Sequence, residues 1–264
     1  MMTRAFALNG AHKVYIIGRR KEKLDEAAEK IATSNVVPVV GDVTDKSSLL
    51  CIAETIKQET GYINLLCCNS GIMGTPMPFK AGEVPAAEFA KAGLERWEDW
   101  NRSFATNSTA IPMCTFAFIE LLDAGNQKGN CTGRKSQVLV TSSIAGYLRV
   151  PGSNLSYSAS KAAATHMVKH LAGTLVPYNI RMNGIAPGLF PSDLAGHLIA
   201  GVKPSGEPTE EGSIGKNVIP AQRTGRDSDI EGTLLFLASA AGAYLNGNIM
   251  VLDGGRMSQL PGTY

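Results

Sequence analysis

The sequence predicts one doubly wound α/β domain, in which helices cover both faces of a parallel sheet. Short runs rich in Val and Ile alternate with helical patterns along the chain, which is typical of strand–helix–strand units. These runs are apolar on both faces, as strands buried between two helical layers are. The length of 264 residues suits a single domain over 1–264, and no linker or internal repeat divides it.

The expected strands are short apolar runs that end in small or polar residues. They lie at residues 12–18, 35–43, 62–71, 136–146, 179–188 and 247–255. Helical patterns fill the intervals at residues 19–32, 45–61, 98–123, 157–176 and 229–240. In the first helix, Leu24 and Ile31 belong to one apolar face. Asp45 is expected to cap the second helix at its start, and Gly61 to end it.

Two long segments have no regular pattern. Residues 72–97 carry several glycines and prolines, and the whole stretch 72–103 is long for a connection. Residues 189–222 are rich in Gly, Pro and Ser. Long loops in compact domains often carry binding functions, so we expect 72–103 and 189–222 to form the rim of a substrate pocket.

The composition excludes several classes of function. A formal net charge of +2 argues against binding to nucleic acid or a membrane surface, and no apolar run is long enough to span a bilayer. The cysteine count is odd and no CxxC spacing occurs, so neither a disulfide framework nor a zinc site is expected, and the expected location is the cytoplasm. His166 and His170 lie four residues apart but lack a third ligand, so no metal site is expected.

The ends of the expected strands share a chemical character. In doubly wound sheets, ligands bind beyond the carboxyl ends of the strands. Small or polar residues stand at these ends: Gly18-Arg19-Arg20, Gly41-Asp42-Val43, Asn69-Ser70-Gly71, Ser142-Ser143 and Pro187-Gly188. Several such ends together indicate a binding site along one edge of the sheet.

Tyr157 and Lys161 are four residues apart in an expected helix and therefore share one face of it. A free tyrosine has a pKa near 10 and exchanges protons poorly at neutral pH. A nearby cation favours the phenolate and lowers that pKa, which would make the pair a general acid/base. A serine hydroxyl from the preceding strand end, Ser143 or the alternative Ser142, could then hold a substrate oxygen. The competing interpretation is an ordinary tyrosine and lysine on a helix surface.

The order of these motifs resembles that of the short-chain dehydrogenase/reductases, a family with a Rossmann-type fold. The matching motifs are GDV at 41–43, NSG at 69–71, Asn107 in FATNSTA, TSSIAG at 141–146, YSASK at 157–161, NGIAPG at 183–188 and LDGG at 252–255. The YxxxK spacing alone is weak evidence, but its place between a serine pair and a PG turn makes the resemblance specific. The resemblance covers residues 1–255.

The resemblance implies a catalytic set. Tyr157 would be the general acid/base of a carbonyl reduction or alcohol oxidation. Lys161 would lower the pKa of Tyr157 and bind the nicotinamide ribose. Ser143 would orient the carbonyl, and Asn107 would support a proton relay through water. The predicted activity is the interconversion of a ketone and a secondary alcohol by an oxidoreductase.

The end of the first strand bears on cofactor choice. An acid there would bind a ribose 2′-OH, whereas an arginine accommodates a 2′-phosphate. The chain has Arg19 and Arg20, so NADP(H) is favoured over NAD(H). The alternative is that both arginines are solvated residues at a helix start, although cations are disfavoured there.

The resemblance implies further cofactor contacts. Asp42 and Val43 would contact the adenine, and the backbone of Ile185 would contact the nicotinamide. The remaining positions that the resemblance places beside the cofactor are Asn69, Gly71, Tyr157, Lys161, Pro187 and Gly188.

The chain departs from the family at its start. Members begin with a strand and a TGxxxGxG turn, whereas MMTRAFALNG resembles the body of the helix that follows that turn. The turn normally supplies backbone N–H groups to the pyrophosphate, so the chain is expected to be N-terminally truncated relative to the family. Two explanations stay open: a start at an internal methionine of a longer protein, or a chain that folds as it stands with weakened or lost cofactor binding.

That departure motivates two alternative functions. One is a non-redox enzyme on the same scaffold, such as an isomerase, dehydratase or cyclase. The other is a cofactor-free binding protein. For the oxidoreductase, the expected partners are a small carbonyl or alcohol substrate and further copies of the chain. A homodimer or homotetramer would form through the helices at 98–123 and 157–176.

Overall fold

The computed structural model describes residues 1–151 and 154–263 and contains the expected parallel strands. The strands are β1 (Val14–Gly18), β2 (Val36–Val40), β3 (Leu65–Cys68), β4 (Gln137–Thr141), β5 (Arg181–Pro187) and β6 (Ile249–Leu252). In the described part of the chain they form a pair, β1–β2, and a four-stranded sheet in the order β3–β4–β5–β6. All of these pairings are parallel.

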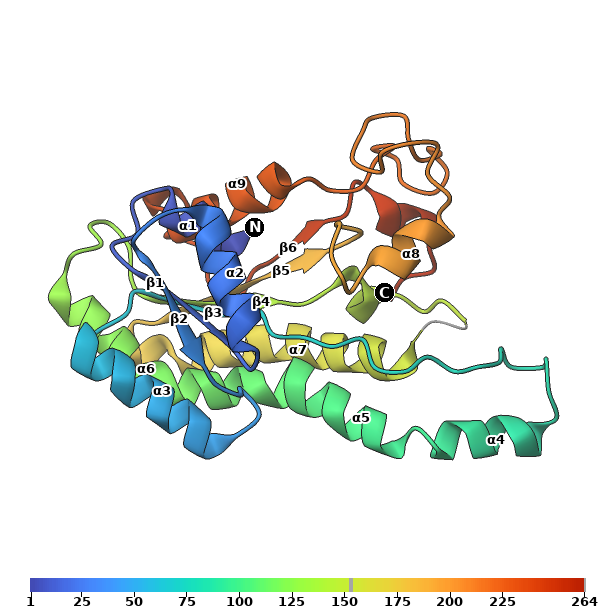
Figure 1. Ribbon diagram of the computed structural model, residues 1–264, viewed down its shortest axis with the longest axis horizontal. Coiled ribbons are helices and arrows are strands. Elements are labelled where there is room, and N and C mark those ends of the chain that lie inside the picture. The colour runs from blue at the N-terminus through green and yellow to red at the C-terminus, as the bar shows by residue number, and fades with distance from the viewer. Residues whose placement is uncertain (152–153, 264) are drawn as a thin grey trace.

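Helices cover both faces of this sheet, as the sequence predicts (Figure 1). They are α1 (Met2–Ala7), α2 (Lys21–Ile31), α3 (Lys46–Glu59), α4 (Ala86–Leu94), α5 (Trp97–Phe104), α6 (Ala110–Lys128), α7 (Leu155–Thr174), α8 (Gly196–Gly201) and α9 (Asp227–Ala238). Within residues 1–151 and 154–263, no helix has the length and apolar content that crossing a bilayer requires.

The core lies in two parts, one on each side of the sheet. Because side chains alternate along a strand, Val138 and Val140 of β4 pack with α3, α6 and α7, whereas Leu139 packs with α9. Leu66 and Leu65 of β3 divide in the same way between the two sides. This two-sided burial confirms the doubly wound α/β fold and explains why the strands are apolar on both faces.

Side-chain caps fix where two helices begin. The carboxylate of Asp45 accepts a hydrogen bond from the Ser48 amide at 2.7 Å, as expected for an N-cap. The side chain of Asn154 accepts one from the Tyr157 amide at 3.2 Å. This second cap starts α7 so that Tyr157 stands in its first turn.

Two expectations about local structure were wrong. The segment 98–123 is not one regular helix, because α5 and α6 are joined by a π-helical turn, η1 (Ala105–Thr109). The segment 72–97 is not wholly irregular, because α4 forms within it. Figure 1 shows α4 and α5 extending beyond the sheet.

Candidate active site

The loop after β4 packs directly on α7. It contains the short 3₁₀ helix η2 (Ile144–Tyr147), which Ser143 caps by accepting a hydrogen bond from the Ala145 amide at 3.2 Å. A Cβ at Gly146 would lie 2.8 Å from the Ala162 nitrogen and the Lys161 carbonyl carbon of α7. Only glycine permits this approach without a shift of one element, so Gly146 helps to set Ser143 beside Tyr157.

Tyr157 and Lys161 are both buried, with exposed fractions of 9% and 3%. The Lys161 amine lies 5.9 Å from the centroid of the Tyr157 ring and donates a hydrogen bond to the Thr141 carbonyl at 2.7 Å. Burial raises the pKa of Tyr157, and a hydrogen bond with Ser143 acts in the opposite direction. Burial lowers the pKa of Lys161 to about 8. The helix therefore holds a tyrosine and a readily titrated lysine against the end of β4.

The adjacent serines have different surroundings. Ser142 is buried, and its hydroxyl donates to the Lys161 carbonyl at 3.0 Å and lies 2.8 Å from the Thr165 hydroxyl. Ser143 is half-buried, and its side chain acts to lower the pKa of Tyr157. The Ser142 hydroxyl therefore joins β4 to α7, whereas the Ser143 hydroxyl lies beside the tyrosine.

Asn107 stands in the π-helical turn η1 and is 1% exposed. Its Oδ1 accepts a hydrogen bond from the Ile72 amide at 2.8 Å. Its Nδ2 donates to the Ile72 carbonyl and to the Ser160 hydroxyl, both at 2.9 Å. The side chain thus ties the segment after β3 to α7. Such π-turns are often found at functional sites.

The residues expected at the adenine end gather around β1 and β2. The Arg19 guanidinium lies 3.8 Å from the Asp42 carboxylate, and both Arg19 and Arg20 are exposed. Hydrogen bonds from the Thr44 hydroxyl and amide, together with the more distant Arg19, lower the pKa of Asp42. Val43 is partly buried and packs against the core.

Other expected cofactor residues lie at the ends of β3 and β5. Asn69 follows β3, and its Oδ1 accepts a hydrogen bond from the Thr141 hydroxyl at 2.9 Å. A Cβ at Gly71 would lie 3.4 Å from both the Asn107 Oδ1 and the Lys161 Nζ. Gly71 therefore lies against the catalytic candidates, and its lack of a side chain leaves room there.

Ile185 lies inside β5, whereas its motif neighbours Pro187 and Gly188 stand at the end of that strand. Gly188, after Pro187 at the end of β5, lies against Asp253, where a Cβ would come within 2.9 Å of the backbone. Ile185, in contrast, lies inside the strand: its side chain is 2% exposed, and its carbonyl accepts a hydrogen bond from the Ser142 amide. Its backbone carbonyl is thus used within the sheet, and the backbone contact with the nicotinamide that the resemblance assigns to Ile185 stays a prediction.

Sequence reasoning missed two residues that position the candidates. The Thr141 carbonyl accepts from Lys161, and the Ser160 hydroxyl accepts from Asn107. Both lie within motifs that were already singled out, TSSIAG at 141–146 and YSASK at 157–161. In the described part of the chain, no group of three His, Cys, Asp or Glu residues is placed to bind a metal ion.

Comparison with known proteins decides the family. A family model described as "Enoyl-(Acyl carrier protein) reductase" matches residues 1–257. The chain is 43% identical to short-chain dehydrogenase/reductase PhomF' of Diaporthe leptostromiformis over 269 residues, covering 100% of this chain and 89% of that protein. It is 38% identical to short-chain dehydrogenase/reductase SAT3 of Stachybotrys chartarum over 277 residues, covering all of both chains.

The chain belongs to the short-chain dehydrogenase/reductase family. It is an oxidoreductase of that family.

Solved structures agree on the fold of this short-chain dehydrogenase/reductase. The RhlG/NADP active-site complex of Pseudomonas aeruginosa matches with a TM-score of 0.75 and 24% identity, covering 96% of this chain and 90% of that one. The 3-ketoacyl-(acyl-carrier-protein) reductase of Brucella melitensis, complexed with NADH, matches with a TM-score of 0.74 and 21% identity, covering 97% and 91%. At these identities the likeness concerns the Rossmann-type fold alone.

Proposed function

We propose that the chain is an NADP(H)-dependent oxidoreductase that interconverts a ketone and a secondary alcohol, with Tyr157 as the general acid/base. The observation that carries the proposal is the buried pair on one face of α7: the Lys161 amine lies 5.9 Å from the centroid of the Tyr157 ring, and Ser143 acts on the same phenol to lower its pKa. These groups can hold a carbonyl oxygen, give it a proton and stabilise the phenolate that remains.

The edge of the sheet fits the nicotinamide half of the cofactor. An ammonium group has three donors, and the Lys161 amine uses one of them on Thr141 within the described residues. The others can bind ribose hydroxyls. Gly71 leaves space beside that amine, and Asn69, Pro187 and Gly188 lie at neighbouring strand ends. When bound, NADPH supplies the hydride that reduces a carbonyl carbon.

Positively charged side chains after β1 support binding of the adenosine half of NADP(H). Arg19 and Arg20 are exposed after β1, and the 3.8 Å between Arg19 and Asp42 leaves the guanidinium able to bind a 2′-phosphate. NADP(H) is therefore favoured over NAD(H), with Asp42 and Val43 beside the adenine. Residues 1–13 contain no glycine-rich turn of the kind that binds a diphosphate through backbone N–H groups. Those residues therefore do not supply the contacts to the diphosphate of the cofactor.

The proton-transfer step follows from the side chains. Ser143 donates a hydrogen bond to the carbonyl oxygen, and Tyr157 gives its hydroxyl proton to that oxygen as the alcohol forms. Protonated Lys161 offsets the charge of the phenolate. Asn107 holds Ile72 and Ser160 in place, and the water relay that the resemblance assigns to it stays a prediction.

The substrate would be a small carbonyl or alcohol that enters between 72–103 and 189–222, which carry α4, α5 and α8. Large apolar side chains are exposed on α5 and α6, including Trp97, Met113 and Phe116. Contact between copies through these helices and α7 would cover them, in a homodimer or homotetramer. All five cysteines are free thiols, which accords with the cytoplasm.

Tyr157→Phe tests the assignment. The purified variant and the wild type would be compared on a panel of ketones with NADPH deuterated at C4, and deuterated alcohol would be measured by mass spectrometry. We expect deuterium transfer by the wild type and a loss of at least about 100-fold in the variant. Unchanged transfer by the variant would refute the role of Tyr157. Product formed without nucleotide would instead favour a non-redox enzyme.

A further inference from the structure

The segment that follows β6 crosses from one side of the candidate active site to the other. Asp253 lies against Gly188 at the end of β5, where a Cβ on the glycine would come within 2.8 Å of the Asp253 Cβ. Residues 261–263 lie against residues 147–149, the backbone at the end of η2 and just after it. We call residues 253–263 the strap, because they join the end of β5 to the loop after β4.

The first part of the strap is fixed by the side chain of Asp253. Its carboxylate accepts hydrogen bonds from two amides of the turn that follows, at 2.8 and 2.7 Å, and so starts the 3₁₀ helix η5 (Arg256–Gln259). The Gly254 carbonyl accepts a hydrogen bond from the Ala221 amide at 2.9 Å. The strap is therefore also attached to the segment 189–222.

The last part of the strap pairs with the backbone around the end of η2 as a short antiparallel ladder. The Thr263 amide donates a hydrogen bond to the Tyr147 carbonyl at 2.7 Å. The Arg149 amide donates one to the Pro261 carbonyl at 2.8 Å, and the Arg149 Nε donates one to the Gly262 carbonyl at 2.8 Å. Two of these three bonds join main-chain groups alone, so the contact depends on backbone position.

This ladder holds the far end of the turn that Ser143 begins. Ser143 caps η2 at its start, and Tyr147 is the last residue of η2. Gly146 packs the same turn on α7, as described above. Because a 3₁₀ helix has three residues per turn, Ser143 and Tyr147 are little more than one turn apart, and a shift of Tyr147 moves Ser143 as well.

The strap contributes little to the core. Its residues from 253 to 263 are exposed or half-buried, and segments with few buried contacts open at little cost to the rest of a fold. Release of the strap from η2 is therefore expected to leave the sheet and its helices folded.

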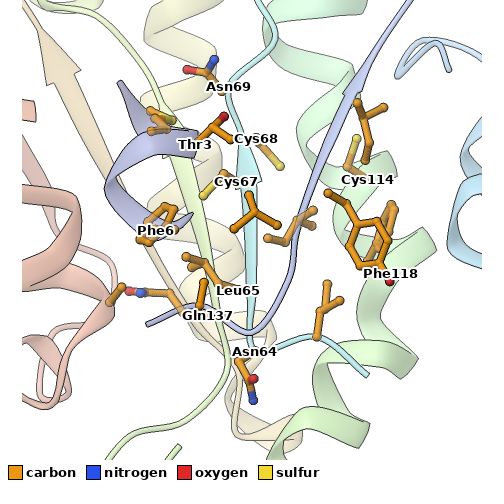
Figure 2. Close-up of a pocket in the computed structure, with 18 of the residues that line it drawn as sticks. Thr3, Phe6, Asn64, Leu65, Cys67, Cys68, Asn69, Cys114, Phe118 and Gln137 are labelled. Carbon is orange, nitrogen blue, oxygen red and sulfur yellow. The ribbon is translucent and has the colours of Figure 1, made fainter. Parts of the chain in front are cut away.

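The nucleotide side of the site is held by other contacts. Figure 2 shows Asn69 just beyond Cys68 at the end of β3, where its Oδ1 accepts the hydrogen bond of the Thr141 hydroxyl. The Thr141 carbonyl in turn accepts the hydrogen bond of Lys161. None of these residues belongs to the strap, so its release should move Ser143 without disturbing them.

We propose that the strap is a positioning element of the reaction, which keeps Ser143 in place beside Tyr157 through the hydrogen bond from the Thr263 amide to the Tyr147 carbonyl. Thr263 acts here through its backbone and not through its side chain. This inference rests on the proposed function.

Thr263→Pro tests the inference, and Thr263→Ala is the matched control. Proline removes the amide donor, whereas alanine keeps it. In the reduction of a ketone with NADPH, we expect Thr263→Pro to lower kcat about tenfold, because misplaced groups react slowly, and to leave the Kd for NADPH within about twofold. Thr263→Ala should keep both constants within about twofold of the wild type.

The outcomes separate the strap from the proposed function. An unchanged kcat in Thr263→Pro, or an equal loss in both variants, would overturn the positioning role while ketone reduction by the wild type stands. A rise in the Kd for NADPH as large as the loss of kcat would also overturn it, since that result indicates a general structural change. A wild type that reduces no ketone would refute the proposed function and the positioning role with it.

A reversible cross-link gives a second test, which does not require the proline variant to fold. Leu148 and Gly262 form a non-hydrogen-bonded antiparallel pair, in which the Cα atoms are about 4.5 Å apart, a separation that a disulfide can span. A Cβ at Gly262 would meet only the Tyr147 carbonyl oxygen, at 3.7 Å. Leu148→Cys with Gly262→Cys would be oxidised with glutathione disulfide, and mass spectrometry would verify the link.

In the Thr263→Pro background, oxidation of this pair should restore kcat to within about threefold of Thr263→Ala, and dithiothreitol should reverse the gain. With Thr263 retained, the oxidised and reduced forms should agree within about twofold. The chain without the introduced pair, treated alike, is the control, because its own five cysteines are free thiols. Failure to restore kcat would overturn the inference. Loss of turnover on oxidation with Thr263 retained would also overturn it, because the strap would then have to open during the reaction.

Discussion

The amine of Lys161 lies 5.9 Å from the centroid of the Tyr157 ring while it donates a 2.7 Å hydrogen bond to the Thr141 carbonyl. One contact joins residues of a single helix face, and the other joins that helix to the end of β4. The lysine is thereby kept within range of the tyrosine in a buried place, where its charge acts strongly on a neighbouring phenol.

Replacement of the two adjacent serines should give different results. Ser143→Ala removes the hydroxyl next to Tyr157, so we expect kcat to fall about 100-fold at little cost in stability. Ser142→Ala removes buried hydrogen bonds to Lys161 and Thr165, so it should lower the free energy of unfolding by about 1–3 kcal/mol. Steady-state kinetics and urea denaturation of both variants would check this. A larger loss of kcat in Ser142→Ala would assign the catalytic role to the other serine.

The buried lysine predicts a pH-dependent cost in stability. Burial lowers the pKa of Lys161 from 10.5 to about 8, so between these values the unfolded chain binds more protons and stability rises with pH. Below about pH 8 both states are protonated and the full cost of burying the charge is present.

Lys161→Met removes this cost. A pKa lowered from 10.5 to about 8 corresponds to roughly 3 kcal/mol, and the Thr141 carbonyl left without its donor costs about 1 kcal/mol. We therefore expect the variant to be more stable than the wild type by about 2 kcal/mol below pH 8. The difference should shrink as the pH rises toward 10.5. Denaturation at several pH values measures it, with exposed Lys169→Met of the same helix as control. A difference that does not change with pH would contradict the lowered pKa.

Gly146→Ala should disturb the site through the backbone. The added Cβ would lie 2.8 Å from backbone atoms of α7, so η2 must move away and carry Ser143 with it. We expect a loss of about 1–3 kcal/mol in stability and a lower kcat. Gly173→Ala in α7 is the control, because nothing lies within 4 Å of a Cβ built at Gly173. This variant should gain about 0.5–1 kcal/mol in the free energy of unfolding. Similar stabilities for the two variants would show that the contact at Gly146 is unimportant.

The arginines after β1 predict cofactor preference. Arg19→Glu with Arg20→Glu should raise the Kd for NADPH by at least about tenfold and leave the Kd for NADH within about threefold. Lys30→Glu, at the far end of α2, is the control, because it changes the net charge by two units without approaching the proposed site. Calorimetric titration gives both constants. Equal weakening for the two nucleotides would remove the arginines from 2′-phosphate recognition.

Much of the fold could be predicted because its signals are local. The apolar runs place β1 to β6, and Asp45 marks the start of α3. The π-helical turn around Asn107 could not be predicted, because it depends on tertiary hydrogen bonds to Ile72 and Ser160 rather than on the sequence FATNSTA. The contrast between Ser142 and Ser143 has the same origin, since only packing on α7 distinguishes two identical neighbours.

The interruption between β1 and β3 could be expected only from the family resemblance, because members carry a strand and a TGxxxGxG turn before the helix that MMTRAFALNG resembles. Each strand has an ordinary apolar run, and nothing in these runs shows which edges will be paired. Ile185 illustrates the same limit: its place in NGIAPG suggested a ligand contact, but its position inside β5 commits its carbonyl to the sheet. Pairing depends on the whole arrangement of strands, which local patterns do not contain.

Titration of this chain with reduced nicotinamide nucleotides tests the central claim most directly. The fluorescence of NADPH and NADH would be followed as the 264-residue protein is added. We predict saturable binding of NADPH with a Kd in the micromolar range, about −8 kcal/mol, and weaker binding of NADH. Absence of binding for both nucleotides up to about 1 mM, about −4 kcal/mol, would contradict an NADP(H)-dependent oxidoreductase.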